Sequence, residues 1–214
     1  MSAIDRAREK LQEVFGFEDF LDGQETVIDE ILSGRDGSVV MPTGGGKSLC
    51  YQLPALCREG VTLVVSPLIA LMKDQVDALE ERGVAVTLIN STLTWNEQKE
   101  RLDGMKSGAY RLVYIAPERF RASSFMSALS DVKIEMVAID EAHCLSQWGH
   151  DFRPDYMRLG KALEKMGRPQ CVALTATATP IVREDIRGVL NLREPFESIS
   201  GFERPNLSFT ITPV

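Results

Sequence analysis

The sequence lacks an apolar run that could cross a membrane, because its apolar stretch 61–72 is interrupted by Ser66 and Pro67. Its first ten residues are charged and contain no apolar core of a signal peptide. It also lacks Cys-x-x-Cys spacing among its four cysteines, which favours reduced thiols over a disulfide framework or a zinc finger. We therefore expect a globular protein of a reducing compartment with no membrane partner.

An excess of positive charge is also missing, since the net charge is −7 in 214 residues. This argues against a protein coated in basic side chains. The negative charge is concentrated near the N-terminus: residues 1–36 contain ten acidic and four basic residues, whereas 144–168 contain three acidic and five basic ones. A locally basic surface is compatible with this distribution. There is no internal repeat or low-complexity segment.

Apolar runs alternate with helical patterns along most of the chain. Two helices are predicted at 3–15 and 22–33, before the first strand. Strands are predicted at 37–41, 61–66, 84–89, 111–116, 134–139 and 171–175. Further helices are predicted at 47–58, 68–82, 94–106, 118–129, 155–166 and 180–190. This alternation predicts an α/β, doubly wound, mostly parallel sheet with helices on both faces. Right-handed crossovers would bring the loops that follow the strands to one edge.

A glycine-rich loop follows the first apolar strand. Residues 41–48 read Met-Pro-Thr-Gly-Gly-Gly-Lys-Ser, close to the phosphate-binding pattern Gly-x-x-x-x-Gly-Lys-Ser/Thr, with Met41 where the first glycine is usual. Glycines let backbone amides turn toward phosphate oxygens, and the loop lies between a strand and a helix, as a phosphate cradle requires. The alternative is a plain turn before a helix. The predicted nucleotide-binding residues here are Thr43, Gly44, Gly45, Gly46, Lys47 and Ser48.

Two carboxylates follow the apolar run 134–139. Asp140 and Glu141 would therefore lie at the edge of the sheet where ligands bind in open α/β folds. We expect Asp140 and Ser48 to hold Mg²⁺, and Glu141 to orient and polarise an attacking water. The alternative is an acidic helix start, since carboxylates favour that position.

Several motifs occur in the order found in superfamily-2 helicases, and together they resemble the first motor domain of the RecQ family. They are Thr43–Ser48, Ser66–Gln75, Tyr114–Arg119, Asp140–His143 and Leu174–Thr179. The resemblance covers nearly the whole chain. It implies a RecA-like fold, ATP and Mg²⁺ as cofactors, and a catalytic set of Lys47, Asp140, Glu141 and His143. Thr175 and Thr177 would couple to that set through hydroxyls, or simply end a strand.

The most specific likeness is the segment from Cys144 to Tyr156, which resembles the aromatic-rich loop that links DNA binding to ATP hydrolysis in this family. Trp148 and Phe152 offer flat faces on which bases can stack. Arg153 could engage a phosphate or stack in the same groove. The alternative is that these aromatic side chains pack on their own domain.

Residues 15–24 resemble the family's adenine-recognition motif. Phe17 would stack on the base, and the Gln24 amide would pair with it. The usual Arg-Pro is Leu21-Asp22 here, so one contact to the base is missing or replaced. Phe17 as a core residue and Gln24 as a solvated one are the alternatives.

The resemblance implies three regions: an N-terminal helical segment with the adenine motif at 1–36, the motor domain at 37–200 and a linker at 201–214. We expect a monomeric ATP-dependent 3′→5′ DNA helicase that acts on single-stranded and forked DNA, in the bacterial nucleoid or the eukaryotic nucleus. The chain lacks the motifs of a second motor domain, its partner, so its own hydrolysis should be weak. An RNA helicase, another superfamily-2 translocase and a nucleotide-binding regulatory module without turnover are the alternatives.

Overall fold

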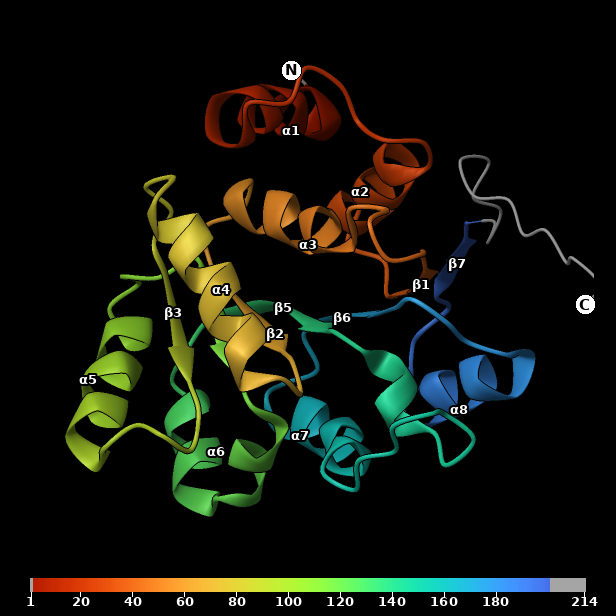
Figure 1. The fold of residues 1–214 in the computed structure, drawn as a ribbon. Coiled ribbons are helices and arrows are strands. Elements are labelled where there is room, and N and C mark those ends of the chain that lie inside the picture. Colours follow the sequence, from red (N-terminus) through yellow and green to blue (C-terminus); the bar gives the residue numbers. More distant parts are fainter. Residues whose placement is uncertain (1, 201–214) are drawn as a thin grey trace, which may run out of the picture.

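The structure, a computed structural model, describes residues 2–200 and contains a seven-stranded sheet with the order β3-β4-β2-β5-β6-β1-β7 (Figure 1). Each strand pairing is parallel. The strands are β1 (Gly37–Val40), β2 (Val61–Val65), β3 (Val86–Ile89), β4 (Leu112–Ile115), β5 (Ile134–Ile139), β6 (Gln170–Thr175) and β7 (Phe196–Ile199). The predicted fold class is confirmed, with strand boundaries that shift by at most two residues.

Helices cover both faces of the sheet. They are α2 (Gln24–Leu32), α3 (Lys47–Leu56), α4 (Ile69–Glu80), α5 (Trp95–Lys106), α6 (Ser123–Leu129), α7 (Leu159–Lys165) and α8 (Pro180–Leu190). One apolar core lies beneath α2, α3 and α4, and the other beneath α5, α6, α7 and α8. β1, β2, β4 and β6 are buried along their whole length, which explains their near-continuous apolar sequences. No helix among residues 2–200 has the length and apolar character to span a membrane.

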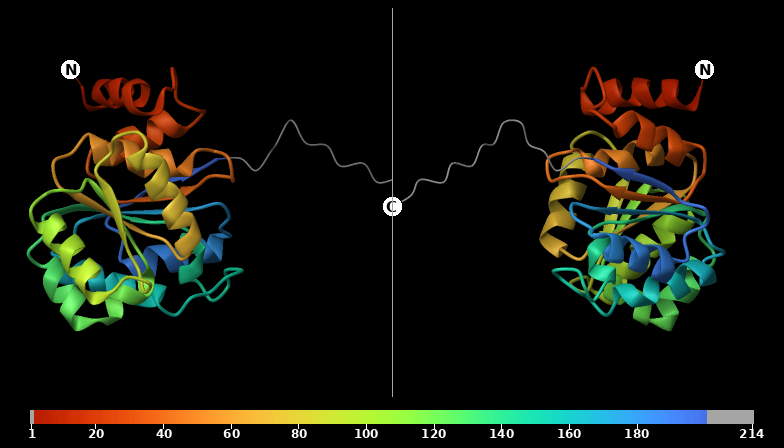
Figure 2. Two further views of the ribbon diagram at one scale, coloured as in Figure 1. Left: turned by 60° about the vertical axis from the view of Figure 1, so that its left-hand side comes forward. Right: turned by 90° about the vertical axis from the view of Figure 1, so that its right-hand side faces the viewer.

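A further layer lies over α2 and α3 (Figure 2). It consists of α1 (Ala3–Lys10) and a turn of π-helix, η1 (Leu11–Phe15). Ala7 and Leu11 pack against Ile28, Leu49 and Leu53 in a small separate core. This layer fixes the position of the segment that precedes α2.

Three predicted helices differ in detail. The helix predicted at 3–15 changes to π geometry at Leu11. The one predicted at 118–129 is a 3₁₀ segment, η2 (Pro117–Arg121), followed by α6, because Ala122 is extended between them. The one predicted at 155–166 begins as the 3₁₀ turn η4 (Tyr156–Arg158) before α7. The linker predicted at 201–214 lies outside the described residues.

The strand β7 was not predicted from the sequence. It extends the sheet beside β1, pairing Gly37 with Phe196 and Val40 with Ile199. The Phe196 ring lies so close to Gly37 that a Cβ there would come within 2.3 Å of it. Gly37 therefore allows the edge strand to pack closely against β1.

A buried carboxylate fixes the start of β1. The Asp36 side chain, 1% exposed, accepts hydrogen bonds from the Cys171 and Arg193 amides, each at 2.9 Å. It also pairs with the Arg168 guanidinium at 2.8 Å. Asp36 thus ties β1 to β6 and to the segment before β7.

We predict that Asp36→Ala lowers the free energy of unfolding by about 3–5 kcal/mol, because it removes the carboxylate partner of the largely buried Arg168 and the acceptor of two backbone amides. Urea unfolding followed by far-ultraviolet circular dichroism would measure this. Lys133→Ala is the matched control, since Lys133 forms an exposed pair with Glu135 and should cost less than about 1 kcal/mol. Equal losses in the two variants would contradict the role given to Asp36.

Candidate functional site

The glycine-rich loop joins the end of β1 to the start of α3. Gly44 and Gly46 have positive φ values of 84° and 76°, which favour glycine. A Cβ on Gly45 would come within 2.6 Å of the Met41 side chain. Met41 is buried, so the residue that replaces the usual first glycine packs beneath the loop. The Lys47 ammonium donates hydrogen bonds to the carbonyls of Met41 at 3.0 Å and Pro42 at 3.4 Å.

Gln24 connects this loop to the segment before α2. Its amide oxygen accepts a hydrogen bond from the Leu21 amide at 2.7 Å, and its nitrogen donates to the Gly46 carbonyl at 3.1 Å. A pocket of about 270 Å³ opens beside it, lined by Phe17, Asp19, Leu21, Gln24, Gly44, Gly46 and Leu49. The Phe17 side chain is half exposed, which does not fit a core residue. Gln24 is buried, which does not fit a solvated residue.

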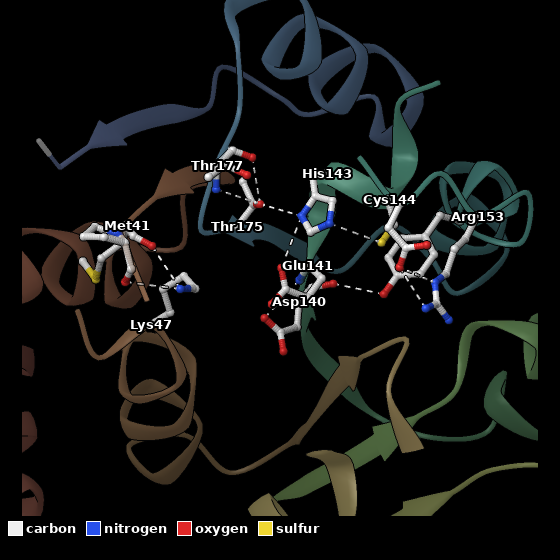
Figure 3. Close-up of polar contacts among 12 residues, drawn as sticks. Met41, Lys47, Asp140, Glu141, His143, Cys144, Arg153, Thr175 and Thr177 are labelled. Atoms are coloured by element: carbon white, nitrogen blue, oxygen red, sulfur yellow. Dashed lines mark hydrogen bonds and ion pairs between the residues drawn. The ribbon is translucent and has the colours of Figure 1, made fainter. Parts of the chain in front are cut away.

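The acidic pair, Asp140 and Glu141, directly follows β5 (Figure 3). Only β6 separates β5 from β1 in the sheet. The Asp140 amide donates to the Val65 carbonyl at 2.8 Å, which continues the pairing of β5 with β2. Burial raises the pKa of Asp140 to about 6, and the Glu141 carboxylate beside it acts in the same direction. Glu141 has a left-handed backbone with φ 49°, uncommon for a residue with a side chain. This turn separates the directions of the two carboxylates.

His143 links the acidic pair to β6. Its Nδ1 lies 3.2 Å from a Glu141 carboxylate oxygen and 2.9 Å from the Thr175 hydroxyl. The Thr175 hydroxyl donates to the Thr177 carbonyl at 3.1 Å, so the tautomer that satisfies these contacts carries its proton on Nδ1. The hydrogen bond from His143 lowers the pKa of Glu141. The Thr175 hydroxyl thus contacts His143, whereas Thr177 takes part through its carbonyl and amide.

The aromatic-rich segment begins with the 3₁₀ turn η3 (Ala142–Leu145). Trp148 is 76% exposed and Phe152 is half buried, so the tryptophan does not pack in its own domain. Arg153 donates to Asp151 at 2.8 Å and to the Pro67 carbonyl at 3.0 Å. These contacts tie the segment to the loop after β2. The DNA contacts of all three residues stay predictions.

A cleft of about 360 Å³ lies where these parts meet. It is lined by Thr43, Pro67, Leu68, Glu141, His143, Cys144, His150, Asp151, Ala176 and Thr177. The His143 and His150 rings stack beside it, with centroids 3.9 Å apart. The glycine-rich loop, through Thr43, Glu141 of the acidic pair, and the aromatic-rich segment therefore face one space.

Residues 22–186 match the family described as DEAD/DEAH box helicase. The chain belongs to this family. Among curated helicases, it is 50% identical over 96% of its length to the ATP-dependent DNA helicase RecQ of Pasteurella multocida and 49% identical over 97% to that of Bacillus subtilis. It spans only 32% and 36% of these two relatives. The resemblance to the first motor domain of RecQ helicases is thereby confirmed.

Solved structures support the same fold. A hypothetical ATP-dependent RNA helicase from Sulfolobus tokodaii superposes on 92% of the chain with a TM-score of 0.67 and 23% sequence identity, and the chain covers 56% of that protein. At this level of identity the comparison shows the fold alone. The DEAD/DEAH box chain therefore has the RecA-like architecture expected from its sequence.

Two features of this helicase domain were missed by sequence reasoning. The Tyr156 hydroxyl donates to the Asp140 carbonyl at 3.0 Å, which supports the acidic pair from behind. Ser146 donates to Asp185 on α8 at 2.5 Å and accepts from the Trp148 amide at 3.1 Å. The first contact spans 16 residues and the second 39, and neither pair has a spacing that signals contact.

We predict that His143→Ala raises the pKa of Glu141, because the hydrogen bond that stabilises its charged form is lost. The carboxylate would then accept a proton at higher pH than in the unaltered chain. Carbon-13 NMR of the side-chain carboxyl, followed through a pH titration, would measure the change. His150→Ala is the control, since His150 lowers the pKa of Glu141 less than His143 or Lys47 does. An unchanged Glu141 pKa in His143→Ala would show that another group holds it down.

Proposed function

We propose that the chain is the ATP- and DNA-binding half of a 3′→5′ DNA helicase, which couples ATP hydrolysis to movement along a single strand and to unwinding of the duplex. The observation that carries the proposal is the hydrogen-bonded link from Glu141 through His143 to Thr175, at a cleft shared with the glycine-rich loop and the aromatic-rich segment. Identity with RecQ helicases supports the choice of DNA. Such an activity would place the protein at the bacterial nucleoid or in a eukaryotic nucleus.

The residues present fit a nucleoside triphosphate with Mg²⁺. A Cβ on Gly45 or Gly46 would collide with Met41 or Gln24, and Gly44 and Gly46 have positive φ, so the loop keeps a glycine backbone that can approach phosphates closely. The base would enter the pocket beside Phe17 and Gln24. Ser48 and Asp140 supply the oxygen ligands that Mg²⁺ prefers, and Mg²⁺ sites in NTPases usually take the remaining ligands from phosphates and water. When bound, Mg²⁺ neutralises phosphate charge.

Each side chain then has a separate task. Lys47 would exchange its carbonyl partners for phosphate oxygens, a stronger, charge-assisted contact. Glu141 would orient the attacking water and take its proton, while His143 holds the carboxylate in place. The Thr175 hydroxyl would connect His143 by hydrogen bonds to the loop that follows β6, so that a shift of His143 would move this loop.

The relatives are about three times as long as the chain, and we propose that their remainder supplies the second motor domain. An arginine finger from such a partner can raise hydrolysis by about 10³–10⁵. The isolated chain would therefore bind ATP but turn it over slowly. A monomeric motor with two RecA-like domains acting on single-stranded and forked DNA follows from this assignment.

We predict that Glu141→Gln retains ATP affinity and lowers turnover by roughly 10²–10⁴, because an amide cannot take the proton from water. Lys47→Ala should instead weaken ATP binding by about 1.5–3 kcal/mol, as a lost charged hydrogen bond does. Calorimetry on the chain and ATPase assays on a two-domain motor would measure both. Lys133→Ala, an exposed lysine far from the loop in sequence, is the control. Full turnover by Glu141→Gln would mean that the chain uses a different base, whereas no ATP binding by the unaltered chain would end the proposal.

We predict that Trp148→Ala combined with Phe152→Ala uncouples DNA from hydrolysis in a two-domain motor. Basal ATPase should persist, because neither ring contacts Lys47, Asp140 or Glu141. Stimulation by single-stranded DNA should fall by at least about tenfold, since each stacked base contributes ~1–3 kcal/mol. Comparison of DNA with RNA as the stimulating strand would separate a DNA helicase from an RNA helicase. Full DNA stimulation in the double variant would assign the segment to packing, and loss of basal ATPase would assign it to support of the active site.

A further inference from the structure

A second exposed tryptophan lies at the start of α5. The chain has two tryptophans, and Trp95 is 72% exposed, close to the 76% of Trp148. Trp95 is held at the first position of α5 by a capping box, in which the Thr94 hydroxyl accepts from the Glu97 amide at 3.4 Å and the Thr94 amide donates to the Glu97 carboxylate at 2.7 Å. The ring is therefore presented to solvent from a fixed backbone rather than from a loose loop.

Trp95 forms one end of a groove of about 280 Å³ between α5 and the segment η2–α6. The charged side chains that line it are Lys99, Lys106, Arg119 and Asp103. Three cations and one acid are thus gathered on a chain whose net charge is −7. The groove fits a ligand that combines flat apolar rings with negative charge.

Arg119 is placed for such a ligand. One of its terminal nitrogens donates to the Gln98 side chain, and its guanidinium lies 5.4 Å from the centre of the Phe125 ring. Its Nε is buried and has no hydrogen-bond partner among residues 2–200. The Lys99 ammonium lies 5.6 Å from the centre of the Trp95 ring. The groove thus holds two aromatic rings, each with a cation beside it, and aromatic rings combined with cations bind bases and phosphates in single-stranded nucleic acids.

α5 and η2 follow the ends of β3 and β4, at the same edge of the sheet at which the aromatic-rich segment follows β5 (Figure 1). Trp95 follows β3 and Trp148 follows β5, with the ends of β4 and β2 between them. Three strand spacings separate β3 from β5, about 14 Å in the sheet. Arg121 on η2 pairs with Asp155, at 2.9 Å for one of the two contacts, so the groove is joined to the end of the aromatic-rich segment.

We propose that the α5–η2 groove is a second contact for the translocated DNA strand, in which a base stacks on Trp95 and the adjoining phosphate engages Lys99 and Arg119. This inference rests on the proposed function and extends the DNA track from Trp148 across the sheet edge to β3. The DNA strand would then be held at two stacking platforms: Trp148, in the aromatic-rich segment that follows the acidic pair, and Trp95, on α5.

The experiment measures binding of a fluorescein-labelled oligothymidylate to the 214-residue chain by fluorescence anisotropy. Trp95→Ala should weaken binding by roughly 5- to 150-fold, the range for loss of one stacked base. Trp95→Phe should restore most of the affinity. Lys99→Ala should reduce the slope of log affinity against log salt concentration by about one, because one phosphate contact is lost. Trp95→Ala should leave this slope unchanged. Ile181→Ala is the matched control, since Ile181 is also an exposed apolar side chain near a helix start, on α8.

A direct readout uses Trp148→Phe, which leaves Trp95 as the only tryptophan. The oligonucleotide should quench the fluorescence of Trp95 in this variant. If the unaltered chain binds the oligonucleotide while Trp95→Ala matches Ile181→Ala and Trp95 shows no quenching, the groove proposal is overturned and the DNA-binding function stands. If the unaltered chain does not bind the oligonucleotide, both fall together.

Discussion

Parallel pairing of all seven strands is the constraint on which the rest of the molecule depends. Each connection must cross a face of the sheet before the next strand begins, so every carboxyl end lies at one edge. The glycine-rich loop after β1, the acidic pair after β5 and Thr175 at the end of β6 meet there although they are far apart in the chain. The apolar side chains buried on both faces of the sheet stabilise the fold. The candidate site residues lie at the edge, outside these two cores.

The site itself is organised around one histidine. His143 contacts Glu141, Thr175 and His150, and the main chain after it forms the start of the aromatic-rich segment. A Cβ on Gly149 would come within 2.3 Å of the His143 carbonyl, so this segment folds tightly against the histidine. A displacement of the segment would therefore act on the Glu141 carboxylate through its contact with His143.

The sheet, its helices, the glycine-rich loop between β1 and α3 and the carboxylates after β5 could be placed from the sequence because each depends on local signals: apolar runs, glycines with a following lysine, and carboxylates directly after a strand. The contact between His143 and Thr175 could only be raised as an alternative, because it depends on how two distant strand ends are aligned. β7 was missed since it is a four-residue edge strand with only Phe196 buried. The support of Asp140 by Tyr156 was hidden because Tyr156 was read as part of an aromatic-rich motif.

β1 is held at both ends. Asp36 binds its start to β6, and at its other end the Met41 amide donates to the Thr175 carbonyl at 3.0 Å. The glycine-rich loop and the end of β6 are consequently held to one frame by the pairing of β1 with β6 and by hydrogen bonds at both ends of β1. Because His143 contacts both Thr175 and Glu141, the acidic pair is connected to the same frame, and its position relative to the glycine-rich loop depends on the register of β1 against β6.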